Sequence, residues 1–241
     1  MLENFNINPS PSDMKERDEI LKNSYNDLIY FGRAFLPNDF LKKSESAPFH
    51  YEIAKQMITP IPGARICNII PRGHGKSVIS KAAIMHKLCF SKTDQQHFVA
   101  WVSEEQGQAI DHLKYLRSHF ENNKMIKYYF GTMDGGSVGK RWTEKDIVTA
   151  KGDRVIAKGT SQRLRGRAEV DVRYTGIVLD DFESELNTKT PERRAEIKKW
   201  IVSTVYPALE ETPGNEGWIW LSGTIVHYDS YLQMINVNIL G

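Results

Sequence analysis

"NIIPRGHGKSVIS", residues 68–80, is the stretch of this sequence that most constrains its fold. Apolar residues lead into a turn that ends in Gly75, Lys76 and Ser77, and an apolar helical pattern follows at once. A phosphate-binding loop of the form G-x-x-x-x-G-K-[ST] ends in this way, although Ile70 stands where the pattern has its first glycine. The stretch is therefore either a nucleotide site with an unusual opening or an ordinary solvated turn.

The residues on both sides of this turn favour the nucleotide site. We expect a strand over residues 65–70 and a helix over residues 77–90. Glycines let successive backbone N–H groups turn inward, and the helix N-terminus adds partial positive charge. Lys76 can then reach the β- and γ-oxygens of a nucleotide, and Ser77 can ligate Mg²⁺.

A second pattern supplies the acids that hydrolysis of a nucleotide needs. The apolar run "GIVLDD" ends in Asp180 and Asp181, and Glu183 lies two residues further on. Asp180 would hold Mg²⁺ through water, and either Asp181 or Glu183 would activate the attacking water. The alternative is a buried strand that ends in solvated acids.

Two further patterns accompany the loop and the acids. Thr224 follows Gly223 at the end of the apolar run "WIWLSGT", where a hydroxyl could sense the γ-phosphate or could belong to a simple turn. The segment "QRLRGRAEV" carries Arg165 and Arg167 close to Arg163. These arginines could neutralise the transition-state phosphate from a neighbouring subunit, contact DNA phosphates, or serve a structural role.

The order of the elements predicts the fold class. Apolar strand patterns alternate with helical patterns along most of the chain, which is typical of an α/β fold with a mostly parallel central sheet and helices on both faces. We expect residues 1–45 to form an N-terminal helical arm or subdomain, and residues 46–241 to form the core with the nucleotide site. Within the first region, residues 13–35 have helical spacing, and the first dozen residues form a loose arm.

Composition limits the class of protein. The chain has 241 residues, a net charge of +2 and two cysteines. A chain this close to neutral is not a polycation, so any nucleic-acid surface must be local. No apolar run approaches the ~20 residues of a membrane span, and the two cysteines are expected to be free thiols in a reducing compartment. We therefore expect a cytoplasmic protein that does not contact a membrane.

Taken together, four motifs resemble one protein family. "PRGHGKS", "KRWTEKDIVT", "LRGRAEVD…IVLDDFE" and "LSGT", in this order and spacing, resemble the ATPase domain of tailed-bacteriophage terminase large subunits. The resemblance covers residues 28–229 and implies a P-loop ATPase of the additional-strand (ASCE) type. Such a domain hydrolyses ATP to drive DNA into a procapsid, and phosphate loops of the family often lack the first glycine.

The resemblance also implies roles for particular residues. The residues implied to bind ATP are Arg72, Gly73, His74, Gly75, Lys76 and Ser77. Phe49 and His50 resemble the segment that packs near adenine, although a core phenylalanine and a helix-start histidine would look the same. Asp180 and Asp181 match the acidic pair, with Glu183 still open as the catalytic carboxylate. Thr224 belongs to the coupling motif, and Arg165 or Arg167 would be the arginine finger.

Partners follow from the same resemblance. The family assembles as a homo-oligomeric ring, usually a pentamer, on the portal protein, acts on double-stranded DNA and works with a small terminase subunit in the cytoplasm of the infected bacterium. A nuclease domain would lie beyond residue 241, so we expect no nuclease activity from this chain. Rival interpretations are a superfamily 2-like DNA-dependent ATPase or helicase, a P-loop kinase, and a non-hydrolysing nucleotide- or DNA-binding scaffold.

Overall fold

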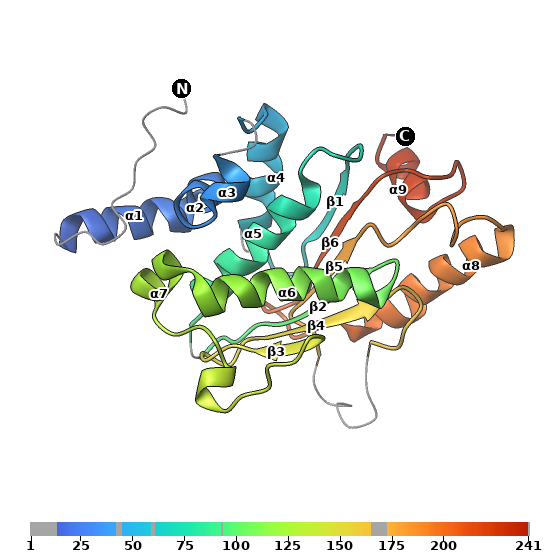
Figure 1. The fold of residues 1–241 in the computed structure, drawn as a ribbon. Coiled ribbons are helices and arrows are strands. Elements are labelled where there is room, and N and C mark those ends of the chain that lie inside the picture. The colour runs from blue at the N-terminus through green and yellow to red at the C-terminus, as the bar shows by residue number, and fades with distance from the viewer. Residues whose placement is uncertain (1–13, 42–44, 59–60, 93, 165–172, 241) are drawn as a thin grey trace.

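The computed structural model describes residues 14–41, 45–58, 61–92, 94–164 and 173–240, which form a sheet between two layers of helices (Figure 1). The strands are β1 (Arg65–Ile69), β2 (Phe98–Ser103), β3 (Asp146–Val148), β4 (Arg154–Gly159), β5 (Gly176–Asp180) and β6 (Trp218–Gly223). The helices are α1 (Met14–Asn26), α2 (Leu28–Phe35), α3 (Pro37–Phe40), α4 (Pro48–Ile58), α5 (Lys76–Cys89), α6 (Gln106–Asn122), α7 (Lys124–Phe130), α8 (Pro191–Trp200) and α9 (Tyr231–Leu240).

The sheet has the strand order β1-β6-β5-β2-β4-β3. Every neighbouring pair is parallel except β3 and β4, which are antiparallel. This arrangement confirms the expected α/β fold with a mostly parallel sheet. Because β6 lies between β1 and β5, the carboxyl ends of these three strands meet at one edge, with Ile69 opposite Gly223 and Asp180 opposite Ser222.

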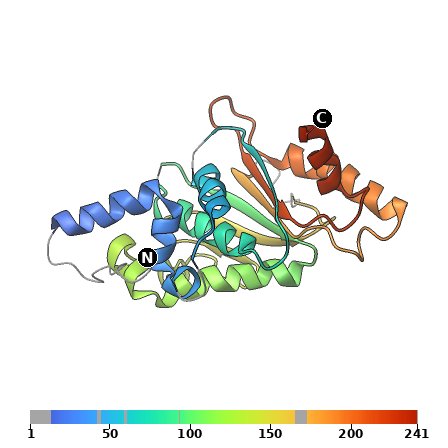
Figure 2. The ribbon, with the colours of Figure 1, turned by 90° about the horizontal axis from the view of Figure 1, so that it is seen from above.

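Both faces of the sheet are buried, as the apolar runs of the strands predict. In β2, Val99 and Trp101 belong to one hydrophobic cluster, whereas Val102 belongs to the other. Helices α4, α5 and α6 cover the first face, and α8 and α9 lie on the opposite side (Figure 2). Alternate side chains of one strand therefore fill two separate cores.

The N-terminal helices pack into the first of these cores. Phe31 and Phe35 of α2 belong to the same buried cluster as α5 and the sheet. Asp27 separates α1 from α2, because its side chain accepts hydrogen bonds from the N–H groups of Ile29 and Tyr30 and so begins the second helix. A division of the chain near residue 45 stays a prediction, and the first dozen residues lie outside the described part.

Some helices are not evident from the sequence. Helix α8 ends at Trp200, and the chain continues as a single π turn, Ile201–Val205. Helices α3 and α7 were not expected, since both are too short for a clear apolar period. Across the described ranges, every helix is too short or too polar to cross a membrane.

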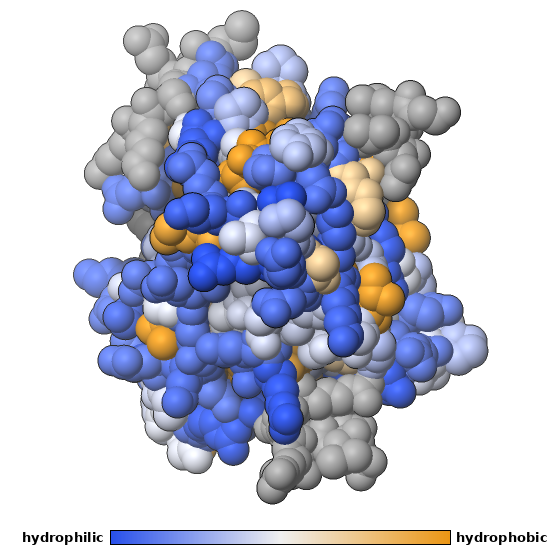
Figure 3. Space-filling model, turned by 90° about the vertical axis from the view of Figure 1, so that its right-hand side faces the viewer, coloured by the Kyte–Doolittle hydropathy of each residue, from blue (hydrophilic) through white to orange (hydrophobic). Residues whose placement is uncertain are grey.

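The surface on the side of α8 and α9 is mostly hydrophilic. Figure 3 views this side, and apolar side chains there form small separate groups among polar ones. Isolated apolar side chains are normal on a protein surface. This view shows no broad apolar patch on the described residues.

Candidate functional site

The turn between β1 and α5 has the backbone geometry of an anion-binding loop. Gly73 and Gly75 have φ angles of 81° and 76°, in the left-handed region that favours glycine. Gly75 also precedes the first residue of α5, and no side chain caps this helix. The first N–H groups of α5 are thus left for another acceptor, together with the positive end of the helix dipole.

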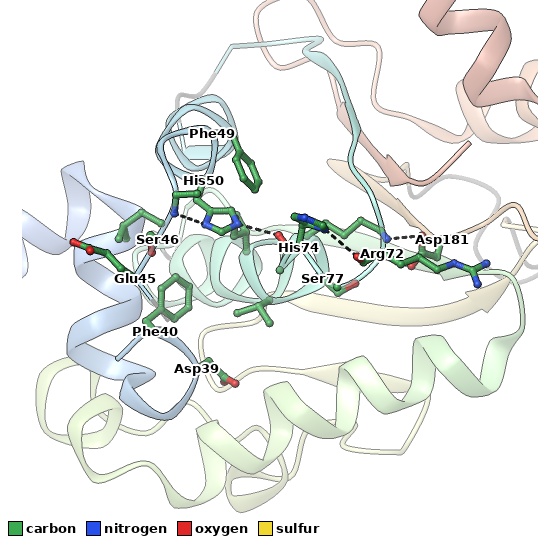
Figure 4. Close-up of a pocket in the computed structure, with 17 residues that line it drawn as sticks. Asp39, Phe40, Glu45, Ser46, Phe49, His50, Arg72, His74, Ser77 and Asp181 are labelled. Carbon is green, nitrogen blue, oxygen red and sulfur yellow. Dashed lines mark hydrogen bonds and ion pairs between the residues drawn. The ribbon is translucent and has the colours of Figure 1, made fainter. Parts of the chain in front are cut away.

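Two histidines brace the loop. The Nδ1 atom of His50 accepts a hydrogen bond from the N–H of Ala47 (3.0 Å), so the proton of this ring lies on Nε2. That Nε2–H donates to the carbonyl oxygen of His74 at 2.9 Å, and the Nδ1–H of His74 donates to the carbonyl oxygen of Arg72 at 2.9 Å (Figure 4). Through His50, helix α4 is therefore hydrogen-bonded to the loop that precedes α5.

The loop forms one wall of a cavity of about 620 Å³. The predicted residues that line this cavity are Phe49, His50, Arg72, Gly73, His74, Gly75, Lys76, Ser77 and Asp181. Lining residues that the sequence did not indicate are Ile29, Asp39, Phe40, Glu45, Ser46, Ala47, Val78 and Ile79. Most of the unpredicted wall comes from the N-terminal helices and the segment before α4, as Figure 4 shows for Asp39, Phe40, Glu45 and Ser46.

Lys76 connects the three strand ends that carry the motifs. Its side chain is only 6% exposed, and its Nζ lies 3.0 Å from Oδ1 of Asp181. The same Nζ donates a hydrogen bond of 3.3 Å to the hydroxyl of Thr224. Thr224 in turn donates to the carbonyl oxygen of Ile70 at 2.9 Å. The loop lysine, the second acid and the threonine are therefore in direct contact.

Asp181 adopts an uncommon backbone conformation. Its φ angle is 47°, which aspartate tolerates better than most residues, and its N–H donates to the carbonyl oxygen of Ser222. The carboxylate is 46% exposed and lines the cavity. This conformation turns the chain at the end of β5, so that the two consecutive acids have different surroundings.

Asp180 is buried beneath the loop. It is 1% exposed, and its Oδ1 atom has no hydrogen-bond partner among the described residues. Burial raises the pKa of Asp180 to about 6, and the neighbouring Asp181 acts in the same direction, while the Ser77 hydroxyl and Lys76 oppose the shift. A buried carboxylate oxygen without a partner is costly, so this position suits a bound cation or an ordered water.

His112 holds the other oxygen of this carboxylate, and the sequence did not indicate it. Its Nε2 lies 3.3 Å from Oδ2 of Asp180, and its ring stacks on Trp101 with 4.7 Å between centroids. Burial lowers the pKa of His112 to about 4, and Lys81 acts in the same direction, so the ring is neutral at pH 7. His112 was hard to recognise from the sequence, because a histidine next to Leu113, a buried residue of α6, does not by itself indicate a functional site.

Glu183 faces a different element. Its two carboxylate oxygens accept hydrogen bonds from the N–H groups of Tyr231 (2.7 Å) and Leu232 (3.0 Å) at the start of α9. The side chain is 5% exposed and is not among the residues that line the cavity. In this structure, Asp181 and not Glu183 is the acid that faces the loop.

The arginine segment is only partly described. Arg165 and Arg167 lie outside the described residues. Arg163 is exposed, and Arg173 donates to the carbonyl oxygens of Pro207 and Leu209 and pairs with Glu211. Arg173 thus holds a surface loop, and the choice between Arg165 and Arg167 stays open.

Two oxygen atoms near the loop could contribute to a site for Mg²⁺. Among the described residues, there is no group of three or more His, Cys, Asp or Glu side chains that could hold a metal ion. Mg²⁺ usually keeps several waters and is bound by one or two carboxylates together with substrate phosphates. The unpartnered Asp180 oxygen and the nearby Ser77 hydroxyl match that pattern.

Neither the comparison with protein families nor the comparison with curated proteins gives a match for this chain. The functional argument therefore depends on the sequence motifs and on the geometry described above.

Proposed function

We propose that this chain is the ATPase motor domain of a viral DNA-packaging terminase large subunit, which hydrolyses ATP to translocate double-stranded DNA into a procapsid. The observation that carries the proposal is the contact of Lys76 with both Asp181 and Thr224. Three motifs from separate parts of the chain meet at one point. An ordinary solvated turn at residues 72–77 would not need the other two motifs beside it. The position of β6 between β1 and β5 supports the additional-strand type of P-loop ATPase.

In this proposal, the loop binds the phosphates of ATP. The uncapped N–H groups at the start of α5 and the ammonium of Lys76 would bind the β- and γ-phosphate oxygens. Phe49 and His50 stand at the same cavity, where they would pack near the base, and the exposed Arg72 would reach the phosphates. Ser77, and Asp180 through water, would hold Mg²⁺, which would neutralise charge on the phosphates.

Asp181 is the better candidate for activating water. A phosphate bound at Lys76 competes with Asp181 for the ammonium, and the released carboxylate can accept a proton from water. Glu183, the other candidate, is engaged by the backbone of α9. Thr224 would sense the γ-phosphate, since its hydroxyl contacts Lys76 and the strand that leads into the loop.

The same proposal assigns partners and location. The active form would be a homo-oligomeric ring, usually pentameric in the family, on a portal protein, with a small terminase subunit and double-stranded DNA. It would act in the cytoplasm of an infected bacterium. Contacts with DNA would be mainly to phosphates, so binding should weaken as salt rises.

Hydrolysis of ATP tests the proposal. Phosphate release is measured with Mg²⁺ and linear double-stranded DNA over a range of protein concentrations, because an arginine from a neighbour makes the isolated chain slow. We expect Lys76→Ala to lose on the order of 10²–10³ in rate. Lys92→Ala, which changes an exposed lysine away from the cavity, should retain the wild-type rate. Absence of hydrolysis by wild type at every concentration with DNA present would favour a non-hydrolysing scaffold.

The arginine finger needs its own comparison. If one of Arg165 and Arg167 completes a neighbour's site, its change to alanine should lower the rate by about 10³–10⁵-fold, while the other change has a small effect. Arg163→Ala, an exposed arginine of the same segment, is the matched control. Small and equal losses for Arg165→Ala and Arg167→Ala would remove both from this role.

A further inference from the structure

A second cavity lies at the opposite edge of the sheet from the loop. Its volume is about 290 Å³, near the lower end of the roughly 300–1,000 Å³ usual for ligand sites. It is formed where the strands begin: Ile66 in β1, Trp218 and Trp220 in β6, and His97 and Thr175 just before β2 and β5. The loop with Lys76 follows the other end of β1, so the two cavities are separate.

A pair of tryptophans and one lysine dominate this second cavity. The rings of Trp218 and Trp220 stack with 4.1 Å between centroids and 27° between planes. The Nζ of Lys87, from α5, lies 5.4 Å from each ring centroid. Trp218 also lies against Gly176 of β5 so closely that a Cβ there would be 2.1 Å from its ring, so only glycine leaves room for Trp218 in this position.

The ammonium of Lys87 lacks a partner of opposite charge among the described residues. Its Nζ lies near the two tryptophan rings and is also close enough to His86 and His97 to interact with them electrostatically, but neither histidine supplies negative charge. None of its three N–H donors has a hydrogen bond to a carboxylate or carbonyl oxygen among the described residues. Burial lowers the pKa of Lys87 to about 8, which still leaves the amine mostly charged at pH 7. A half-buried cation beside aromatic rings and apolar side chains is therefore available to an anion.

We propose that this second cavity binds a small planar organic carboxylate, with its apolar body against the tryptophans and its carboxylate on Lys87. The apolar part of the wall is formed by Met57, Ile61, Pro62, Ala64 and Ile66. Two carboxylates line the same cavity: that of Asp94 is exposed and that of Glu216 is half-buried. One ammonium matches one negative charge. The two acids repel any anion, and they therefore disfavour a phosphate with two charges more strongly than a carboxylate with one.

The proposal is tested with a charged probe and its neutral counterpart. Binding of 4-fluorobenzoate and of 4-fluorobenzamide is measured by ¹⁹F NMR titration of the full chain. Four proteins are compared: wild type, Lys87→Met, Lys92→Met and Lys76→Ala. Lys87→Met keeps an unbranched apolar side chain, and Lys92→Met removes an exposed charge close in sequence to the cavity without altering its lining. Lys76→Ala tests whether the probe binds the phosphate loop instead.

We expect wild type to bind the benzoate roughly tenfold or more tightly than the benzamide, because charge-assisted hydrogen bonds are about twice as strong as neutral ones. Lys87→Met should bind the two probes equally, while Lys92→Met and Lys76→Ala keep the preference. The proposal is overturned if wild type does not prefer the benzoate, if Lys87→Met keeps the preference, or if Lys76→Ala loses it. A folded far-UV spectrum for each variant keeps these outcomes interpretable.

Discussion

At the scale of single residues, the site depends on the surroundings of one buried lysine. Lys76 is 6% exposed, yet it has a carboxylate at 3.0 Å and a hydroxyl at 3.3 Å. Its carboxylate partner, Asp181, is about half exposed, so water screens the pair and its contribution to stability is small. The pair therefore has more to do with positioning charge in the cavity than with holding the fold.

Asp181→Asn separates chemistry from stability. Asparagine also tolerates a positive φ angle, so the turn after β5 can be kept while the base is removed. We expect the rate of ATP hydrolysis to fall by about 10²–10⁴-fold, as for loss of a general base. The free energy of unfolding should change by about 1 kcal/mol or less. Steady-state phosphate release and urea unfolding measure the two effects, and an unchanged rate would exclude Asp181 as the residue that activates water.

At the scale of elements, α9 depends on a side chain far away in the sequence. Glu183 accepts the N–H groups of Tyr231 and Leu232, which have no acceptor within their own helix. Burial raises the pKa of Glu183, and the two N–H donors act in the opposite direction by favouring the charged form. A carboxylate at a helix N-terminus also interacts favourably with the helix dipole.

Glu183→Ala should therefore act on stability. It leaves the N–H groups of Tyr231 and Leu232 without their acceptor at the buried N-terminus of α9. We therefore expect the free energy of unfolding to fall by about 1–3 kcal/mol. Glu185→Ala, an exposed acid two residues further along the chain, is the matched control and should have little effect. Denaturant unfolding measures both. If Glu183→Ala is as stable as wild type and yet abolishes hydrolysis, Glu183 takes the catalytic role instead of Asp181.

The elements differ in how far the sequence predicts them. The strand that leads into the loop and the helix that follows it were expected within one residue of their observed bounds, because apolar runs and glycines mark them clearly. Helix α7 was missed, although Asn123 caps it through the N–H of Ile126, because seven residues do not establish a helical period. The sequence did not predict the antiparallel pairing of β3 with β4, because a turn between two short strands does not show where those strands pair in a sheet.

At the scale of the whole molecule, long-range packing builds the part of the cavity that the sequence did not indicate. Asp39 lies on the cavity wall and accepts a hydrogen bond from the hydroxyl of Tyr115, which is 76 residues away. Phe40 packs so closely on Gly32 that a Cβ there would be 2.6 Å from the ring. A single sequence contains no record of such contacts, so the motifs predict the loop side of the site but not its opposite wall.

The pH dependence of global stability should reflect His86. Its Nε2–H donates to the carbonyl oxygens of Ser24 and Tyr25, which joins α5 to α1. Burial lowers the pKa of His86 from its ordinary 6.5 to about 4. Between these values the unfolded chain binds a proton that the folded chain does not, so stability is complete above pH 6.5 and falls as the pH is lowered towards 4. The full loss from this residue is on the order of 3 kcal/mol.

His86→Gln keeps an N–H donor at this position but cannot titrate. We expect it to reduce the loss of stability between pH 6.5 and pH 4 without abolishing it, because His112 has a similarly lowered pKa. Urea unfolding at half-unit pH intervals measures the slope. An unchanged slope in His86→Gln would show that His86 is not a source of the pH dependence.

Equilibrium binding of ATP is the most direct test of the central claim, that the loop after β1 is a phosphate site. Titration of wild type and Lys76→Ala with a non-hydrolysable ATP analogue and Mg²⁺ does not depend on an arginine from a neighbouring subunit. The account predicts saturable binding to wild type and at least tenfold weaker binding to Lys76→Ala, since the lysine contributes charge-assisted hydrogen bonds to the phosphates. Failure of wild type to bind the analogue, or equal binding by the two proteins, would contradict it.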